Sequence, residues 1–358
     1  MKNWESEELH HQSPAEPAPG FQLQPSQLLT LNSQLLTPMK LLIPGGSGQV
    51  GTILARHFHA KGDEVVVLGR NISTAPWRTA RWDGRSLGPW ARELDTTDIV
   101  INLAGRSVNC RYTPANRREI IESRVDSVRV VGEALRQAAP RERTWLQAST
   151  ATIYAHRYDA ANDEATGIIG GNEPGAPENW NFSIEVAKAW EQALADAVTP
   201  HTRKVALRSA VVLSPDRGGI FDTLLTLVRR GLGGTSGDGR QYVSWVHERD
   251  FIRAVEWLII HEAVDGAVNI AAPGPLPNAE FMRLLRQGWG QRIGLPATTW
   301  MLELGAIAMR TETELVLKSR RVVSGRLMEA GFTFEYPEWG RAAANLCAQV
   351  RQGTSKPA

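Results

Sequence analysis

The sequence contains little cysteine and no long apolar run. Its two cysteines, Cys110 and Cys347, match no metal-ligand or redox spacing, so no metal site is expected and a reducing compartment is favoured. No apolar run reaches the ~18 residues that a membrane-spanning helix needs. Acidic residues stand at positions 5, 7 and 8, where a secretory signal would be basic. We therefore expect a cytoplasmic protein without a membrane partner.

The sequence also lacks a large excess of positive or negative charge. The formal net charge is +2, and no dense block of Lys and Arg is interleaved with aromatic residues. Because such a block is the usual footprint of phosphate-backbone binding, a nucleic-acid partner is not expected. The hydrophobic fraction of 42% and the charged fraction of 22% are ordinary for a globular protein. The length suits one large domain and a smaller one, at roughly 100 to 200 residues per domain.

The first 38 residues differ from the rest of the chain. They are rich in Gln, Pro, Ser and Glu, with only short pairs of leucines. This composition predicts a disordered extension over residues 1–38. Because Met39 directly precedes a strand-like run, a translation start at Met39 is an open alternative.

From Met39 onward, short apolar runs alternate with amphipathic stretches, which predicts βαβ units and a parallel sheet. After residue 213 the pattern loosens into Gly-rich and then mostly helical segments. We expect a dinucleotide-binding domain over 39–213, with sheet elements returning around 267–271, and a smaller substrate-side lobe over 214–358. Strands are predicted at 40–43, 64–68, 98–103, 144–148, 205–213 and 267–271, and helices at 49–60, 114–139, 181–197 and 251–261.

The strongest motif is the glycine-rich stretch between the first strand and the first helix. Such glycines permit a tight turn and a close backbone approach to a pyrophosphate, and the free N–H groups of the helix attract the phosphates. The strand before it and the second strand about 20 residues later fit a Rossmann-type, doubly wound α/β fold. The residues predicted to bind the cofactor here are Gly45, Gly46, Ser47, Gly48, Gln49, Val50 and Gly51.

The second strand ends at Gly69 and Arg70, where a protein that prefers NAD usually offers a carboxylate. A guanidinium can pair with the 2′-phosphate of NADP, whereas a carboxylate would repel it. The sequence therefore predicts NADP as the cofactor, against the alternative of a solvated surface arginine. The third strand leads into Ala104 and Gly105, small residues against which a cofactor fits at the carboxyl end of a parallel strand.

These motifs resemble the short-chain dehydrogenase/reductase superfamily of the extended type. More narrowly, the chain after residue 38 is similar to an atypical, YfcH-like subgroup of the NAD(P)-dependent epimerase/dehydratase family. That subgroup has its own C-terminal domain, which would begin here at about residue 278. The matching stretches are 102–105, 121–124, 189–191, 207–213, 244–247, 277–281 and 329–334.

The resemblance implies further cofactor contacts outside the glycine-rich stretch. Arg124 makes physical sense as a second cation near phosphate, although an exposed helix arginine is the alternative. The resemblance implies contacts from Gly69, Arg70, Leu103, Ala104, Glu119, Arg124 and Val212.

The chain departs from the superfamily at its catalytic pair. Pro44 replaces the usual Thr before the first glycine, which a strand-to-turn junction tolerates. The Tyr-x-x-x-Lys pair falls on Ser183 and Ala187, neither of which can serve as the lowered-pKa acid/base. Lys188 lies one residue off, about 100° around the helix, and cannot simply substitute.

Hydroxyl residues after the predicted strand over 144–148 are the candidate replacements. Thr150 aligns with the superfamily's catalytic hydroxyl, and Tyr154 carries a nearby phenol, with a packed aromatic as the equal alternative. Arg208 and His247 are candidates for lining a substrate cleft, although a lone histidine is more often structural.

Two functions therefore stand open. The first is an NADP-dependent oxidoreductase or epimerase acting on a small carbonyl or hydroxyl compound. The second is a non-catalytic NADP-binding regulator or scaffold, since some members of the subgroup are linked to cell division. Extended members of the superfamily often dimerise through a pair of helices, so a homodimer is an expectation of the resemblance.

Overall fold

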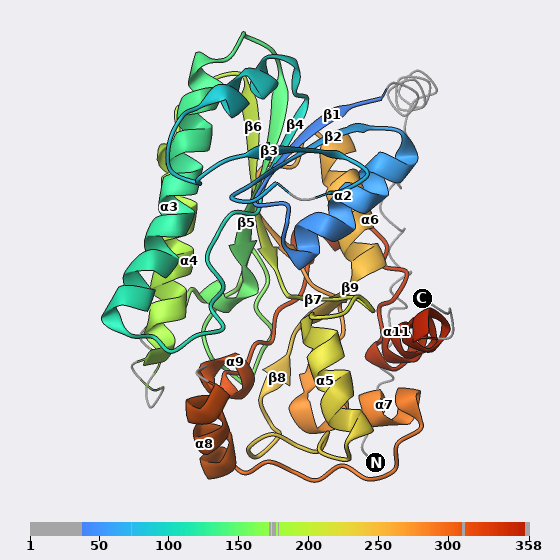
Figure 1. Cartoon of the computed structure of the whole chain (residues 1–358). Coiled ribbons are helices and arrows are strands. Elements are labelled where there is room, and N and C mark those ends of the chain that lie inside the picture. Colours follow the sequence, from blue (N-terminus) through green and yellow to red (C-terminus); the bar gives the residue numbers. More distant parts are fainter. Residues whose placement is uncertain are drawn as a thin grey trace, which may run out of the picture. The chain divides into compact units, whose positions relative to one another are not determined.

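The computed structural model describes residues 38–72, 74–171, 173, 177, 179–309 and 312–354 (Figure 1). The expected disordered extension lies outside these residues, apart from Pro38. Residues from Pro38 onward form one compact unit.

A seven-stranded sheet forms the centre of this unit, in the order β10-β6-β5-β4-β1-β2-β3. Every pair of neighbouring strands is parallel, as the predicted βαβ pattern requires. The order reverses direction beside β1, which creates the crevice where doubly wound sheets bind ligands. The strands are β1 (Lys40–Pro44), β2 (Glu64–Gly69), β3 (Arg78–Arg81), β4 (Ile99–Asn102), β5 (Arg143–Thr150), β6 (Thr202–Ser209) and β10 (Gly266–Ile270).

Helices cover both faces of the sheet because strand residues alternate between them. Leu41 and Ile43 pack with α2 (Gln49–Lys61) and α6 (Glu248–Ile260) on one face. Leu42 packs with α3 (Pro114–Gln137) and α4 (Asn179–Asp196) on the other. Figure 1 shows these two helical layers on either side of the strands.

The C-terminal lobe has its own apolar cluster. Phe221, Trp245, Phe281 and Trp339 are buried together there. The Phe281 and Trp339 rings stack 4.1 Å apart. The lobe contains α5 (Ile220–Arg229), β8 (Tyr242–Val243), β9 (Trp245–His247), β11 (Leu276–Pro277), α7 (Asn278–Trp289), α8 (Thr299–Met309), α9 (Glu314–Leu317) and α11 (Trp339–Thr354). The short helix α10 (Gly325–Glu329) packs instead on the main sheet, through Leu327.

The predicted fold class, a doubly wound parallel sheet with a smaller, mostly helical lobe, is confirmed. The prediction of one strand over 205–213 is wrong. β6 ends at Ser209, and β7 (Val211–Leu213) leaves the main sheet to pair with β9. Between them, Ala210 N donates to Ile270 O of β10. The sequence pattern also did not reveal β3, whose residues Arg-Thr-Ala-Arg carry no apolar signal, or the short 3-10 helix η1 (Pro89–Thr96).

Candidate functional site

The glycine-rich turn packs so closely that two of its glycines admit no side chain. Gly45 has a φ of 73°, and a Cβ placed on it would lie 2.5 Å from Ala104 Cα. A Cβ on Gly51 would overlap the backbone of Gly46, where the helix crosses the turn. Gly45 N also donates to Leu68 O at 2.8 Å. The turn therefore lies against the ends of β1, β2 and β4, at the crevice beside β1.

The N-terminus of α2 leaves its backbone donors open. Its N-cap, Gly48, has no side chain to accept a hydrogen bond from the first turn. The amide nitrogen Nε2 of Gln49 is buried without a partner among the described residues, and it lies where a Cβ on Gly219 would be. Unpaired N–H groups at a helix start attract an anion. The residues here fit the phosphates of a dinucleotide.

Two arginines stand at the carboxyl ends of β2 and β3, at the same edge of the sheet. Arg70 comes directly after β2 and is exposed, and no carboxylate of the described part of the chain pairs with it. Gly69 pairs in register with Arg81, which is the exposed last residue of β3. Since the sequence pattern missed β3, it also missed that Arg81 stands beside the Arg70 strand.

The loop after β4 is covered by a partly buried cation. A Cβ on Gly105 would lie 3.1 Å from the guanidinium carbon of Arg124. Arg124 Nη1 donates to Arg106 O and Ile120 O, and its guanidinium lies 4.9 Å from the Trp190 ring centre. Burial lowers the pKa of Arg124 to about 10. Within the described ranges no carboxylate forms an ion pair with Arg124, so a bound anion would complete its electrostatics.

The other residues predicted to contact the cofactor lie around this loop. Leu103 N donates to Pro44 O at 2.8 Å, which ties the loop to the end of β1. Ala104 N donates to the side chain of Asn102. Glu119 forms an ion pair with Arg106. Val212, on β7, packs against the core on the α2 side of the sheet.

The candidate hydroxyl residues after β5 have defined partners. Thr150 Oγ1 accepts from Thr152 N and so caps the short helix η2 (Ala151–Ile153). The Tyr154 phenol donates to Asn269 Oδ1 at 3.0 Å and accepts from Arg208 Nη1 at 2.9 Å. Tyr154 is 3% exposed, and burial raises its pKa. These contacts are those of the packed aromatic that the sequence left as an alternative.

Neither residue proposed for the cleft has a free polar end. Arg208 forms two hydrogen bonds to the Glu191 carboxylate, at 2.8 and 2.7 Å. His247 is fully buried and caps α6, because its Nδ1 accepts from Arg249 N at 3.1 Å. Its Nε2 lies 3.1 Å from Asn345 Oδ1 and is therefore the protonated nitrogen. Burial lowers the pKa of His247 to about 4.

A buried polar cluster occupies the position of the missing catalytic pair; its members, Ser183, Glu314, Lys318 and Arg320, are called here the C-terminal cluster. Ser183 Oγ donates a hydrogen bond to the Glu314 carboxylate. Lys318 Nζ lies 3.5 Å from Ser183 Oγ and 3.7 Å from Glu314 Oε1. Arg320 Nη2 also lies 3.7 Å from Glu314 Oε1. Sequence reasoning missed this cluster because three of its members lie more than 130 residues beyond Ser183 in the chain.

The cluster reaches the end of β5 as well. Lys318 Nζ donates to Thr152 O at 3.3 Å, and Arg320 Nε donates to Thr152 Oγ1 at 3.1 Å. Ala187, the second vacated position, is fully buried against Val322 and other apolar residues. Lys188 Nζ is bound to Gly170 O instead, at 2.9 Å. The C-terminal segment thus fills the space that the pair would use.

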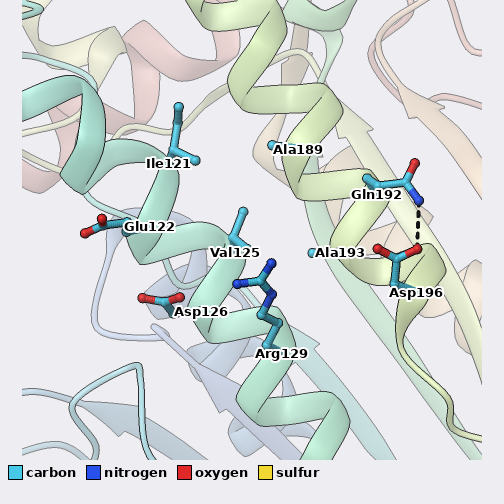
Figure 2. A pocket seen from close by; sticks show the side chains of 9 residues that line it. All are labelled: Ile121, Glu122, Val125, Asp126, Arg129, Ala189, Gln192, Ala193 and Asp196. Carbon is cyan, nitrogen blue, oxygen red and sulfur yellow. Dashed lines mark hydrogen bonds between the residues drawn. The ribbon is translucent and has the colours of Figure 1, made fainter. Parts of the chain in front are cut away.

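A separate groove of about 390 Å³ lies between α3 and α4 (Figure 2). Apolar side chains line its floor, and Gln192 donates to Asp196 at its edge. Its lining residues are Ile121, Glu122, Val125, Asp126, Arg129, Ala189, Gln192, Ala193 and Asp196. Over the described ranges, no group of His, Cys, Asp and Glu is placed to hold a metal ion, and no helix is long and apolar enough to cross a membrane.

The parallel sheet, the glycine-rich turn and the open helix start together define a dinucleotide-binding α/β protein. A family model described as "NAD dependent epimerase/dehydratase family" matches residues 41–271, and a domain of unknown function, DUF1731, matches residues 297–346. The chain belongs to the NAD-dependent epimerase/dehydratase family, and the resemblance drawn from its motifs is confirmed.

Curated relatives match along most of their own length. The human epimerase family protein SDR39U1 is 28% identical over 313 residues, covering 87% of this chain and 100% of the relative. The epimerase family protein YfhF of Bacillus subtilis is 26% identical and covers 87% of this chain and 98% of the relative.

Solved structures agree with this assignment. The crystal structure of human SDR39U1 (isoform 2) with NADPH superposes with a TM-score of 0.74 and 26% identity, over 87% of this chain and 99% of that one. A nucleoside-diphosphate sugar epimerase from Corynebacterium glutamicum gives a TM-score of 0.68 and 26% identity, over 93% of this chain and 66% of that one.

Proposed function

We propose that this chain is an NADP-dependent oxidoreductase or epimerase of the cytoplasm, acting on a small carbonyl or hydroxyl compound. The observation that carries the proposal is the cradle beside β1. There, glycines that admit no Cβ lie next to uncapped helix donors. Arg70, directly after β2, and Arg124, beside the loop after β4, form no ion pair with a described carboxylate. A similar human protein was crystallised with NADPH, which supports the same cofactor here.

The chain's own residues would bind and orient the reactants. A nicotinamide cofactor supplies hydride transfer when it is bound. The α2 N-terminus would hold its phosphates, Arg70 would select the 2′-phosphate, and Arg124 would cover the loop after β4. Thr150, partly exposed at the end of β5, would orient a substrate oxygen.

Binding and turnover test this proposal separately. Titration with NADPH and NADH, followed by cofactor fluorescence, should show tighter binding of NADPH. A panel of aldehydes, ketones and nucleotide sugars should then oxidise bound NADPH. Thr150→Val should slow that oxidation more than it weakens NADPH binding, because the hydroxyl would face the substrate. Equal affinity for both cofactors would contradict the NADP assignment.

A second candidate is a non-catalytic NADP-binding regulator or scaffold linked to cell division. It is favoured by Ser183 and Ala187, which replace the superfamily's acid/base pair, and by the tight burial of Ala187. If NADPH binds tightly but no compound of the substrate panel is turned over, this second function is favoured. A fold alone does not decide between them.

A further inference from the structure

The C-terminal cluster contains one polar atom that has no partner. Glu314 is fully buried, and its Oε1 receives the hydrogen bond from Ser183 and faces both cations. Its other oxygen, Oε2, is buried with no hydrogen-bond partner among the described residues. A buried carboxylate oxygen is costly unless it is paired. The buried, unpaired Oε2 therefore favours uptake of a proton by the Glu314 carboxylate.

The other polar ends of the cluster are already engaged. Lys318 Nζ has three acceptors around it, namely Thr152 O, Ser183 Oγ and Glu314 Oε1. Two of the three ammonium donors of Lys318 are thus engaged in hydrogen bonds, and its charge is paired with Glu314. Arg320 donates to Thr152 Oγ1 and to three backbone carbonyls. Both cations hold Glu314 rather than reach a ligand.

The location of Glu314 suits an acid/base group. Ser183 stands where the superfamily has its catalytic tyrosine, and its hydroxyl is hydrogen-bonded to the Glu314 carboxylate. The cluster is tied to Thr152, two residues after Thr150, the candidate for orienting the substrate oxygen. Ser183, Thr152 and Thr150 are themselves partly exposed.

We propose that the C-terminal segment supplies the acid/base group that α4 lacks, with Glu314 exchanging a proton with the substrate oxygen by way of the Ser183 hydroxyl, which is hydrogen-bonded to it. Lys318 and Arg320 are positioning residues that hold the same carboxylate oxygen. The inference rests on the proposed function, because the hydride acceptor is the oxidised nicotinamide of NADP.

The step balances with one proton and one hydride. In the oxidative direction, the substrate O–H bond breaks and its proton passes to Ser183 Oγ, while the Ser183 hydroxyl proton passes to Glu314 Oε1. The adjacent C–H bond breaks, its hydride with two electrons passes to the nicotinamide, and a carbonyl double bond forms. Reduction of a carbonyl runs the same transfers in reverse, with a protonated Glu314 as the donor.

The charges around Glu314 set its proton affinity. Burial raises the pKa of Glu314, and Arg320 and Lys318 oppose that rise. Burial likewise lowers the pKa of Lys318 to about 8. His156 and Glu173 are further titratable groups that interact electrostatically with Lys318. Tyr112, which precedes α3, is another titratable group nearby, and burial together with Glu314 raises its pKa. An acid/base group transfers protons best when its pKa lies near the working pH.

The first test needs no substrate. Carbon-13 NMR of protein labelled at the Glu side-chain carboxyl should reveal one resonance that E314Q lacks and that titrates above the ordinary range of glutamate. Removing the neighbouring cation in Lys318→Met should move that titration to higher pH. A Glu314 that titrates in the ordinary range in both proteins would overturn the proposal.

The second test uses turnover with the substrate panel. E314Q should lose about 100-fold to 10,000-fold in kcat, the usual contribution of general acid–base catalysis, with NADPH affinity unchanged. The acidic limb of the pH–rate profile in the oxidative direction should vanish in E314Q and move to higher pH in Lys318→Met. A merely structural role would not move that limb.

Two further variants guard against a folding defect. E314Q/K318M restores the local charge balance, and it should bind NADPH and remain inactive. Glu248→Gln is a matched control, since Glu248 is also buried with an unpaired Oε2, at the start of α6, and it should keep full activity. Wild-type protein that binds no NADPH contradicts the proposed function, whereas tight NADPH binding with an active E314Q overturns this inference alone.

Discussion

The cofactor side and the proton-transfer side of this site are built in different ways. The cofactor side comes mainly from one continuous stretch, in which a strand, a tight glycine turn and a helix start follow one another. The proton-transfer side joins the end of β5, one turn of α4 and a segment that lies after α8. The first depends on backbone shape, whereas the second depends on side-chain charge held in a buried setting.

This difference has a consequence for how each side can change. Backbone-shaped sites tolerate almost no added atoms, because the turn meets backbone rather than flexible side chains. In a cluster of side chains, by contrast, one residue can be replaced if another residue provides the same charge. The loss of Tyr and Lys from α4 therefore fits a chain that keeps its cofactor turn and recruits groups from its C-terminal domain.

The largest effect is expected from Gly45→Ala. The new Cβ would meet the Ala104 backbone at 2.5 Å in a left-handed conformation, so we expect a loss of roughly 3 kcal/mol in stability and at least about 100-fold in NADPH affinity. Thermal unfolding and NADPH titration measure the two losses.

Gly62→Ala is the matched control for Gly45→Ala. Gly62 also has a positive φ, 96°, but a Cβ there would meet nothing within 4 Å. The Gly62→Ala variant should lose only about 1 kcal/mol in stability, the cost of a left-handed backbone for a residue with a Cβ, and should keep NADPH binding. Equal NADPH affinity in the two variants would contradict a backbone-shaped cofactor side.

The next effect concerns stability and pH at His247. Burial holds its pKa at about 4, against 6.5 for an ordinary histidine. The unfolded chain therefore takes up a proton at higher pH than the folded one, and the stabilisation present above pH 6.5 is lost as the pH falls toward 4. The loss is on the order of 3 kcal/mol, and chemical denaturation across this range measures it.

His247→Asn should remove most of that pH dependence while keeping a capped α6, since Asn is also a good N-cap. NADPH affinity and turnover should stay unchanged, because the imidazole faces Arg249 and Asn345. A variant with ordinary stability but weakened turnover would instead return His247 to the substrate cleft.

Sequence reasoning reached the cofactor side because its signals are local. The spacing of Gly45, Gly48 and Gly51 between a strand and a helix determines the turn, and the residue after β2 is read directly from the chain. Even so, β3 was missed, because an edge strand with the sequence Arg-Thr-Ala-Arg has no apolar alternation. The break after Ser209 was missed because apolar residues continue through both β6 and β7.

The proton-transfer side could not be predicted from local sequence patterns. Glu314 and Lys318 carry no motif, and only the folded chain brings them to Ser183. The burial that matters for their pKa values is likewise a property of the packed structure. Tyr154, by contrast, stood in a familiar sequence pattern, yet its hydroxyl is shared between Asn269 and Arg208.

Arg70→Asp should produce a smaller effect, confined to cofactor choice. Removing a charge-assisted contact to the 2′-phosphate and adding a repulsive carboxylate should cost about 1.5–3 kcal/mol for NADPH, or roughly 10-fold to 100-fold in affinity, with NADH affected little. Arg92→Asp, on η1 before β4 and so at the opposite edge of the sheet, controls for net charge. An unchanged NADPH preference in Arg70→Asp would remove Arg70 from the cofactor side and leave Arg124 as its principal cation.

The smallest effect on the site is expected from the groove between α3 and α4, where we propose that two copies of the chain pair. Its apolar floor, including Val125 and Ala189, is bordered by charges of both signs, which suits a self-complementary contact between copies. Val125→Arg should convert a dimer into a monomer in light scattering, whereas Glu133→Ala, further along α3, should not. Because none of the residues predicted to contact the cofactor lines the groove, the monomeric variant should keep its NADPH affinity. A wild-type chain that is already monomeric would exclude this pairing, and a fall in NADPH affinity on dissociation would mean that the partner copy helps to shape the cofactor side.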